Sequence, residues 1–411
     1  MASRGRSTVA SLVVVGMAWV APLAWQAGAA SHVPAGPSVA VPAGGVLGSL
    51  TAVSAASSTD AWAVGATDPG PNGFGQHPLA FHWNGAGWVQ VPVPVIDSRY
   101  WPGIAASETI SAVSDLSPTD AWAAGNEEVE QSGMQHPIVW HWNGHVWAPV
   151  STRGFTGLWT SVMAIVAQSP RDVWVGGFIP VGCELAFHWN GRRWANVNVD
   201  PTAPRPLPCD GDSIVALSAA GPRDLLAVGG SVWGTWALRW NGTTWGQTPV
   251  PTLPNARPFQ VQLWGVDAVN SHDAWSVGGG SECGTFVGCT YPPPIVEHWD
   301  GHQWTPVATD GLGPSILHSV SMAFATDGWA VGTAYPTHAL SAPLIVHWRR
   351  GRWSLVDVGA SALHDTLAAV ADVSPRLAWA VGYQSPIPRQ PFRDQRTLIL
   401  EWDGRSWHSS G

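Results

Sequence analysis

The sequence predicts an all-β protein, and within that class a seven-bladed β-propeller with four antiparallel strands per blade. Two phrases carry this prediction, D-A-W-x-x-G and H-W-N-G-x-x-W, because both recur seven times, with variation, from about residue 47 to the end. Their spacing is constant: Leu50 precedes Trp62 by 12 positions and Trp83 precedes Trp88 by 5, and every unit repeats both distances. A repeated unit of roughly 50 residues with four short strands is typical of a propeller.

The composition agrees with an ordered, turn-rich β protein. Apolar residues make up 45% of the 411 residues, and there are 46 glycines and 35 prolines, which excludes a disordered chain. All 19 basic residues are arginine, so lysine nucleophiles and Schiff-base chemistry are excluded.

The first 30 residues resemble a secretory signal peptide. Two early arginines precede an apolar stretch from Val9 to Leu23, and Ala27-Gly28-Ala29 offers a small-residue cleavage site. The alternative, a retained membrane anchor, fits less well because Pro22 interrupts a run already short for a span. We therefore expect a secreted, extracellular protein with a signal peptide at 1–30, an N-terminal arm at 31–46 and the propeller at 47–411.

The charge of the mature chain narrows the classes of partner. Loss of Arg4 and Arg6 with the signal peptide changes the formal net charge from −9 to −11. An acidic chain disfavours nucleic acid and anionic lipid as partners. No later segment is apolar and long enough to cross a bilayer, so we expect no membrane insertion after cleavage.

The first strand of each unit is predicted from paired apolar positions. Leu50 lies ten positions before the repeated aspartate Asp60, and the smaller Ala52 follows two positions later. Residues two positions apart point to the same face of a strand, so the pair predicts one face whose side chains become smaller where space is limited. The same pairs in the other units are Ile110 and Ala112, Val162 and Ala164, Ile214 and Ala216, Leu263 and Gly265, Leu317 and Ser319, and Leu367 and Ala369.

The other three strands follow from the two phrases. The second strand is D-A-W-A-V-G, the third ends in H-W, and the fourth begins at the last tryptophan. Asn-Gly or Asp-Gly separates the third and fourth strands in six units, which is a strong hairpin signal. Unit six has Arg349-Arg350-Gly351 instead, so we expect a different turn there.

The repeat resembles those of the kelch and galactose-oxidase-type propellers. In those families too, an apolar strand, a strand ending in glycine, a strand with an aromatic residue and a tryptophan-led strand make one blade. The resemblance covers about residues 47–411, with Gly-Gly at 229–230 and 278–279 and single glycines in most units. Galactose-oxidase copper chemistry requires a tyrosine cross-linked to a cysteine, and no motif supports that here. We expect no cofactor and no metal.

The segments of variable length all belong to one face of the predicted propeller. Turns from the first to the second strand and from the third to the fourth are constant, and we call their side the turn face. All length variation lies in the second-to-third loops and between blades, and we call that side the loop face. Loops on a rigid scaffold concentrate binding residues, so the loop face is the expected ligand-binding surface.

Aromatic residues mark candidate ligand contacts on the loop face. Tyrosine and tryptophan combine a flat apolar ring with a polar group, which suits stacking on a sugar or anchoring a protein partner. The alternative is that they seal the ends of the blades. The candidates are Tyr100, Trp101, Trp159, Trp233, Tyr291, Tyr335 and Tyr383.

Repeated histidines and aspartates are interpreted as structural. His82, His141, His188, His298 and His347 share one third-strand position, too far apart in a propeller to bind one metal ion. The repeated aspartates precede the second strand, where we expect their carboxylates to accept hydrogen bonds from backbone N–H groups of the turn. They are Asp60, Asp120, Asp172, Asp224, Asp273 and Asp327.

The four cysteines predict two disulfides on the loop face. Cys283 and Cys289 lie in one loop, and Cys183 and Cys209 are the remaining pair. A four-thiolate metal site is the alternative, but no C-x-x-C spacing supports it.

Two classes of function remain open. We favour an extracellular binding or scaffold propeller that recognises a glycan or an extracellular protein, and we expect it to be a monomer. The alternative is a secreted hydrolase or lyase acting on polysaccharide, although the chain has no G-x-S-x-G, P-loop or paired-carboxylate motif. Its candidate carboxylates are Glu127, Glu128, Glu130, Asp210 and Asp212.

Overall fold

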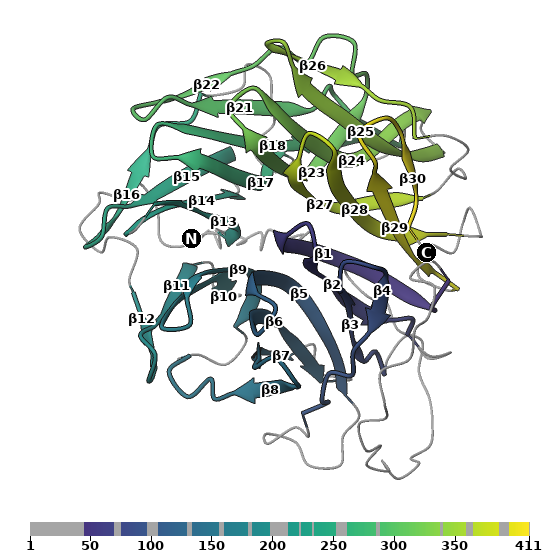
Figure 1. Ribbon diagram of the computed structural model, residues 1–411. Helices are drawn as coiled ribbons and strands as arrows, with labels where there is room; N and C mark the ends of the chain where they lie inside the picture. Colours follow the sequence, from purple (N-terminus) through teal and green to yellow (C-terminus); the bar gives the residue numbers. More distant parts are fainter. Residues whose placement is uncertain are drawn as a thin grey trace, which may run out of the picture.

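The computed structural model shows seven four-stranded antiparallel sheets arranged as blades around a central axis (Figure 1). Each blade is one continuous segment whose strands pair in chain order from the inside outward. The described part of the chain contains no helix with the length and apolarity to cross a membrane. It comprises residues 45–69, 75–96, 106–129, 134–155, 160–179, 183–197, 213–221, 223–231, 234–251, 261–284, 288–337, 340–358, 365–385 and 394–410.

The first and second strands form the inner half of every blade. The first strands are β1 (Gly48–Ser57), β5 (Ala106–Ser117), β9 (Ser161–Ser169), β13 (Ser213–Gly221), β17 (Val261–Asn270), β23 (Ser315–Phe324) and β27 (Thr366–Ser374). The second strands are β2 (Asp60–Thr67), β6 (Asp120–Val129), β10 (Asp172–Ile179), β14 (Asp224–Ser231), β18 (Asp273–Gly280), β24 (Asp327–Thr337) and β28 (Leu377–Gln384).

The third and fourth strands form the outer half. The third strands are β3 (Pro78–Trp83), β7 (Met134–Trp142), β11 (Cys183–Trp189), β15 (Gly234–Trp240), β21 (Ile295–Trp299), β25 (Leu340–Arg349) and β29 (Arg396–Trp402). The fourth strands are β4 (Trp88–Gln90), β8 (Trp147–Val150), β12 (Trp194–Asn196), β16 (Trp245–Thr248), β22 (Trp304–Pro306), β26 (Arg352–Leu355) and β30 (Trp407–Ser409). These bounds confirm the prediction of seven blades.

One prediction about the first strand is wrong. Leu50 and Ala52 do not share a face, because the register with β2 shifts between them. Leu50 packs in the core between blades 7 and 1, whereas Ala52 packs in the core between blades 1 and 2. A β-bulge inserts one residue and reverses the parity, so each first strand supplies side chains to both of its neighbours.

Tryptophans fill the interface between consecutive blades, which we call a seam. Trp62 of blade 1 is fully buried and contacts Trp142 at 4.9 Å and Trp147 at 4.8 Å in blade 2, measured between ring centroids. The second-strand tryptophan therefore inserts between the two tryptophans of the next blade. The repeated tryptophans of the units thus form the seams. The corresponding contacts join Trp122 to Trp189, Trp174 to Trp240 and Trp245, Trp275 to Trp348 and Trp353, and Trp329 to Trp402 and Trp407.

The ring closes through a seam of the same kind between blades 7 and 1. Trp379 contacts Trp83 at 5.5 Å and Trp88 at 5.7 Å. The chain just before β1 adds backbone hydrogen bonds to blade 7: Gly48 N–H donates to Gln395 O, and Thr397 N–H donates to Val46 O, both at 2.9 Å. Residues 38–42 resemble the fourth-strand sequence at 89–92, so we expect them to pair with blade 7, and they lie outside the described residues.

Hydrogen bonds between first strands reinforce the seams. Asp115 N–H of blade 2 donates to Ser54 Oγ of blade 1 at 3.0 Å, and Ala268 N–H of blade 5 donates to Ser218 Oγ of blade 4 at 3.0 Å. In blade 5 the hydroxyl is replaced by the carboxylate of Asp267, which accepts from Met322 N–H at 2.7 Å. Side chains of one blade thus satisfy backbone donors of the next.

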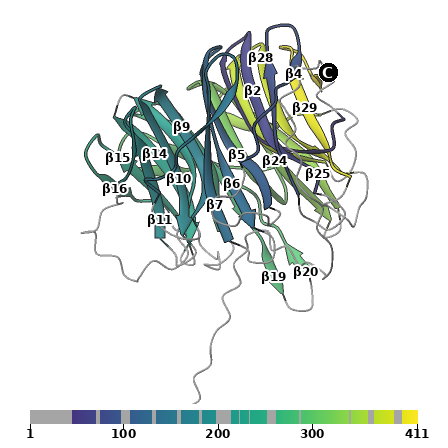
Figure 2. The same ribbon diagram turned by 90° about the horizontal axis from the view of Figure 1, so that it is seen from below.

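The two faces of the propeller differ as expected. On the turn face, Asn84 Oδ1 accepts hydrogen bonds from the N–H groups of Ala86 and Gly87, and five other units repeat this arrangement. Blade 6 instead has a two-residue turn with positive φ at Arg350 and Gly351, which confirms that its turn differs. On the loop face, an extra hairpin of β19 (Glu282–Gly284) and β20 (Gly288–Thr290) projects from blade 5 (Figure 2).

Candidate functional site

Three of the predicted tyrosines come together on the loop face. Tyr291 follows β20 in blade 5, Tyr335 lies in β24 of blade 6 and Tyr383 lies in β28 of blade 7. The rings of Tyr291 and Tyr335 stack with centroids 3.6 Å apart and planes within 5°. Burial, followed by the neighbouring Tyr291 and Tyr383 hydroxyls, raises the pKa of Tyr335 to about 12. All three side chains are half-buried, so they expose aromatic surface on three consecutive blades.

Backbone contacts hold the stacked pair in place. Ser315 N–H, at the start of β23, donates to Pro292 O at 3.2 Å and so ties the chain after Tyr291 to blade 6. Tyr335 N–H donates to Pro314 O at 2.9 Å. The register between β24 and β25 shifts after Ala334, so Tyr335 lies in an irregular stretch of strand, a device that redirects a side chain.

The remaining predicted site residues are placed less completely. Tyr100, Trp101, Trp159, Trp233 and Cys209 lie outside the described residues, as do Glu130, Asp210 and Asp212. Cys183 begins β11 at the loop face. In the projecting hairpin the backbones of Cys283 and Cys289 are directly paired across β19 and β20, a register compatible with the predicted disulfide.

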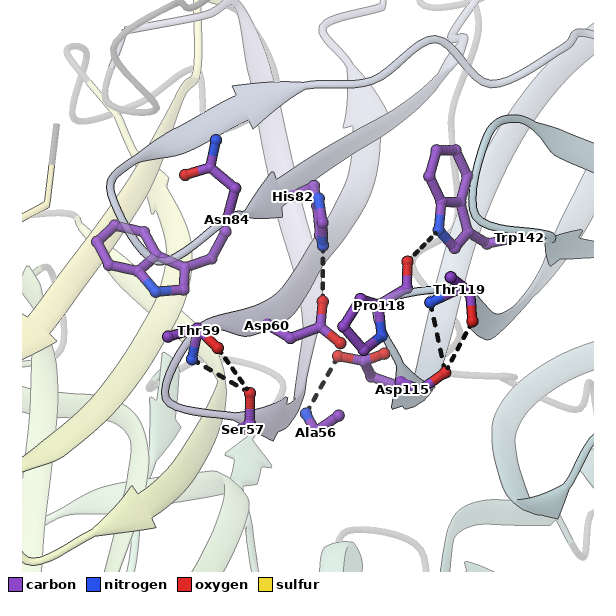
Figure 3. Close-up of polar contacts among 12 residues, drawn as sticks. Ala56, Ser57, Thr59, Asp60, His82, Asn84, Asp115, Pro118, Thr119 and Trp142 are labelled. Carbon is purple, nitrogen blue, oxygen red and sulfur yellow. Dashed lines mark hydrogen bonds and ion pairs between the residues drawn. The ribbon is translucent and has the colours of Figure 1, made fainter.

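The repeated aspartates do not lock the turns as predicted, and they pair instead with the repeated histidines. Asp60 Oδ1 lies 2.7 Å from His82 Nε2 (Figure 3). The His82 ring stacks on Trp62 with the ring centroids 4.4 Å apart. Four other blades repeat the histidine–aspartate pair at 2.8–2.9 Å. Other side chains satisfy the backbone groups of the turn. Ser57 Oγ accepts a hydrogen bond from Thr59 N–H, and Trp83 Nε1 donates one to Ser58 O.

Blades 4 and 7 replace these pairs in a coordinated way. In blade 4, Arg239 makes a bidentate ion pair with Asp224 at 2.8 and 2.7 Å and lies 5.8 Å from the ring centroid of Trp299. Leu226 takes the place of the tryptophan in this seam. In blade 7, Glu401 replaces the histidine and Leu377 replaces the aspartate, and Glu401 accepts from Ser410 Oγ at 2.8 Å.

A buried polar row crosses blade 2 near the loop face. Glu108 of β5, Glu127 of β6 and His136 of β7 are direct cross-strand neighbours, and each is at most 6% exposed. Glu108 Oε1 accepts from Ile96 N–H at 2.7 Å, and burial lowers the pKa of His136. Of the predicted carboxylates, Glu127 is therefore part of a buried network, while Glu128 lies half-buried beside it.

Several buried acids were not anticipated from the sequence. Burial, followed by the charge of Asp60, raises the pKa of Asp115 to about 8. Burial, followed by the charges of Asp327 and Asp267, raises the pKa of Asp372 to about 8. The sequence does distinguish these two aspartates. Both lie five positions after the first-strand apolar residue, where other units have Ala55, Ala167 and Ala219.

Glu297 is the most isolated of these acids. It is 1% exposed, neither of its carboxyl oxygens has a hydrogen-bond partner, and burial raises its pKa to about 7. Its repeat position is otherwise apolar, with Phe81, Trp140, Phe187, Leu238, Val346 and Leu400 in the other blades. The described residues contain no group of three or more histidine, cysteine, aspartate or glutamate side chains suited to a metal ion.

Comparisons with known proteins support the fold. No protein-family model and no curated protein matches the sequence. The chain is similar to YCF48 from Cyanidioschyzon merolae, with a TM-score of 0.51 and 13% identity over 90% of this chain and 99% of that chain. It is also similar to the WD40 β-propeller domain of Doa1, with a TM-score of 0.50 and 11% identity over 89% and 95%, and to U3-55K, with 0.50 and 12% over 86% and 95%. At these identities the likeness shows a β-propeller and leaves the kelch-type relationship unconfirmed.

Proposed function

We propose that the protein is an extracellular binding propeller that recognises a glycan or protein ligand on its loop face. The observation that carries this proposal is the convergence of Tyr291, Tyr335 and Tyr383 from three consecutive blades. Each tyrosine comes from a different unit of the chain, and each lies at a variable loop rather than at a repeat position. A site assembled from several blades is a common use of a rigid scaffold.

The tyrosine cluster offers a ligand the apolar faces of its aromatic rings, with hydroxyl groups at their edge. Tyr291 and Tyr335 cover one face of each other, so a ligand would stack on an outer ring face or contact Tyr383. Aromatic rings contact the C–H surface of a sugar or an apolar side chain, and phenol hydroxyls supply hydrogen bonds. Because the backbone on both sides of the pair is hydrogen-bonded, little ordering is required on binding.

Two further features of the sequence support an extracellular setting and a kelch-like origin. The signal-peptide pattern at residues 1–30 and the two cysteine pairs are typical of exported proteins. The blade pattern is that of kelch and galactose-oxidase-type repeats, and we propose a divergent relationship with them. No cofactor is needed for this function.

The proposal is tested by probing a glycan array and a set of extracellular proteins with the mature chain, and then measuring affinity by calorimetry for any ligand found. Tyr383→Ala and Tyr291→Ala are each expected to weaken binding by about 1–3 kcal/mol. The matched control is His145→Ala in the exposed turn of blade 2, on the opposite face, which should leave affinity unchanged. Loss of binding in the control but not in the tyrosine variants would reject the loop-face site.

A second candidate function is a polysaccharide hydrolase or lyase. The buried row of Glu108, Glu127 and His136 is the observation that favours it, since it places two carboxyl groups and an imidazole side by side near the loop face. Release of reducing ends from a polysaccharide panel that disappears in Glu127→Gln would support the enzyme. Ligand binding by a catalytically silent wild-type protein would support the binding propeller.

A further inference from the structure

The Tyr291–Tyr335 pair has a geometry that goes beyond ligand recognition. The two rings are parallel within 5° with their centroids 3.6 Å apart, and the neighbouring Tyr291 hydroxyl contributes to the raised pKa of Tyr335. With the planes parallel and the centroids this close, the two rings lie face to face, and carbons of one ring lie over carbons of the other. Among the described residues, the other closely stacked aromatic pairs join tryptophan to histidine, as in Trp329 and His347, and contain no second phenol.

The pair also joins two different blades at a fixed separation. The chain after Tyr291 is tied to β23 through Pro292 and Ser315, and Tyr335 is tied to Pro314 in the same segment. These hydrogen bonds limit how far the rings can slide relative to each other. Reacting groups held about 3–3.5 Å apart with aligned orbitals react with effective concentrations far above those in solution.

We propose that Tyr291 and Tyr335 form an oxidative cross-linking site, in which a carbon–carbon bond joins the two rings ortho to their hydroxyl groups. The co-reactant is hydrogen peroxide used by a haem peroxidase, a one-electron oxidant that acts from outside. Each phenol loses one electron and its hydroxyl proton and becomes a phenoxyl radical. The electrons and protons reduce one peroxide to two waters.

The two radicals then combine. The unpaired electron of a phenoxyl radical is shared by the oxygen and the ortho and para carbons, in orbitals perpendicular to the ring. Parallel rings direct these orbitals toward each other, so the new ortho–ortho bond forms between the faces. Each bonded carbon then gives its hydrogen as a proton to solvent, and each oxygen takes a proton back, which restores both aromatic rings. Two phenols and one peroxide thus give one biphenol and two waters.

The surroundings of the pair favour this course. Burial raises the pKa of Tyr335 to about 12, so this phenol is neutral at physiological pH and gives its proton to solvent as it loses its electron. Both rings are half-buried, so one edge is open to an external oxidant while the shared faces exclude solvent. The product would join blade 5 covalently to blade 6 beside the projecting hairpin. Its formation does not require the proposed ligand.

The test treats the dilute mature protein with horseradish peroxidase and hydrogen peroxide. The expected products are monomers that show dityrosine fluorescence, have lost the mass of two hydrogen atoms, and yield one linked peptide containing Tyr291 and Tyr335. Tyr291→Phe and Tyr335→Phe keep a stacked ring without an oxidisable hydroxyl, and each should reduce intramolecular cross-linking on the order of tenfold or more. His145→Ala, in the exposed turn of blade 2 on the opposite face, is the control and should cross-link like the wild type.

Three results would overturn the proposal. They are cross-links between molecules only, a linked peptide that lacks either Tyr291 or Tyr335, and no cross-link under conditions in which a free tyrosine peptide couples. Thermal unfolding of each variant before oxidation establishes that the Phe substitutions leave the propeller folded. An unchanged melting temperature together with lost cross-linking assigns the loss to chemistry.

Discussion

Asp115 of blade 2 lies beside Asp60 of blade 1, and its Oδ2 accepts a hydrogen bond of 3.1 Å from the backbone N–H of Ala56 (Figure 3). Asp372 of blade 7 has the same relationship to blade 6, where its Oδ2 accepts from Ala323 N–H at 3.2 Å. In both seams an acid that is difficult to ionise faces the aspartate of a histidine–aspartate pair.

These acids make stability depend on pH. The pKa values of Asp115 and Asp372 are raised from 3.8 to about 8, so the folded protein binds more protons than the unfolded chain between these values. Their contribution to stability is complete below pH 3.8 and is lost as the pH rises through about 8. We expect the melting temperature to fall over this interval, and Asp115→Asn with Asp372→Asn to reduce the fall.

The control for this measurement is Asp403→Asn in an exposed turn. Hydrogen bonds from Ser406 and then Arg405 backbone N–H lower the pKa of Asp403, so its contribution is lost as the pH falls below 3.8. Asparagine already occupies this turn position in other blades, as at Asn84. Asp403→Asn should therefore leave the slope between pH 4 and pH 8 unchanged, and an equal flattening by this variant would contradict the assignment.

Glu297 is predicted to destabilise the seam between blades 4 and 5. A buried carboxyl group without a partner carries an uncompensated desolvation penalty, so Glu297→Leu should raise the free energy of unfolding by about 1–3 kcal/mol. Its pKa of about 7 places the loss of stability between pH 4.5 and pH 7, and the gain should be largest above this interval. Urea unfolding at pH 6 and pH 8 measures both effects. A destabilised Glu297→Leu variant would reveal an essential role for the carboxyl group.

The substitutions in blade 4 are predicted to depend on each other. Leu226→Trp alone places an indole where Arg239 and Trp299 already fill the seam, and should cost about 1–3 kcal/mol. Adding Arg239→His recreates the stack seen between Trp329 and His347 and retains the pair with Asp224. The double variant should recover most of the loss in a urea-unfolding cycle. Additive losses would show that the two positions are uncoupled.

Two disulfides are predicted, Cys283–Cys289 and Cys183–Cys209. The backbone register between β19 and β20 supports the first pair, and the second pair stays a prediction because Cys209 lies outside the described residues. Each bridge should contribute about 2–4 kcal/mol by restricting the unfolded chain. Peptide mapping of the unreduced protein should recover these two linked peptides and no free thiol. The crossed pairing would reject the assignment.

Tyr100 and Trp101 remain candidates for the ligand surface. Replacing both with alanine should weaken binding by about 1–3 kcal/mol if their rings stack on the ligand. Calorimetry of the double variant against the wild type measures the change, with His145→Ala again as the control. Unchanged affinity would confine the site to the tyrosine cluster of blades 5–7.

The sequence predicted the fold because the repeat encodes the seams directly. Leu50 and Trp62 lie 12 positions apart and Trp83 and Trp88 lie 5 apart, and the equivalent residues keep both distances in every unit, so the strands could be recognised. The bulge between Leu50 and Ala52 could not be inferred, because parity along a strand assumes a regular register. The partners of Asp60 were also missed, since the distance from the second to the third strand varies with loop length.

The site was predicted in part. The presence of Tyr291, Tyr335 and Tyr383 in variable loops indicated the face, but loop sequences do not encode which blades bring their rings together. The stack depends on hydrogen bonds at Pro292 and Pro314, which join residues far apart in the chain. Glu297 was not predicted as a buried acid, although the other six units have an apolar residue at its position.

The closing seam has a consequence for the order of the blades. Trp379 sits between Trp83 and Trp88 as its counterparts do elsewhere, and the chain before β1 and the chain after β30 both hydrogen-bond to β29 of blade 7, Val46 at Thr397 and Ser410 at Ile399. The chain can therefore be circularly permuted in principle: a linker across this gap and new termini in the exposed turn at 143–146 would retain every seam. Blade 1 is first only in the order of synthesis, because in the folded ring every blade contacts one neighbour on each side.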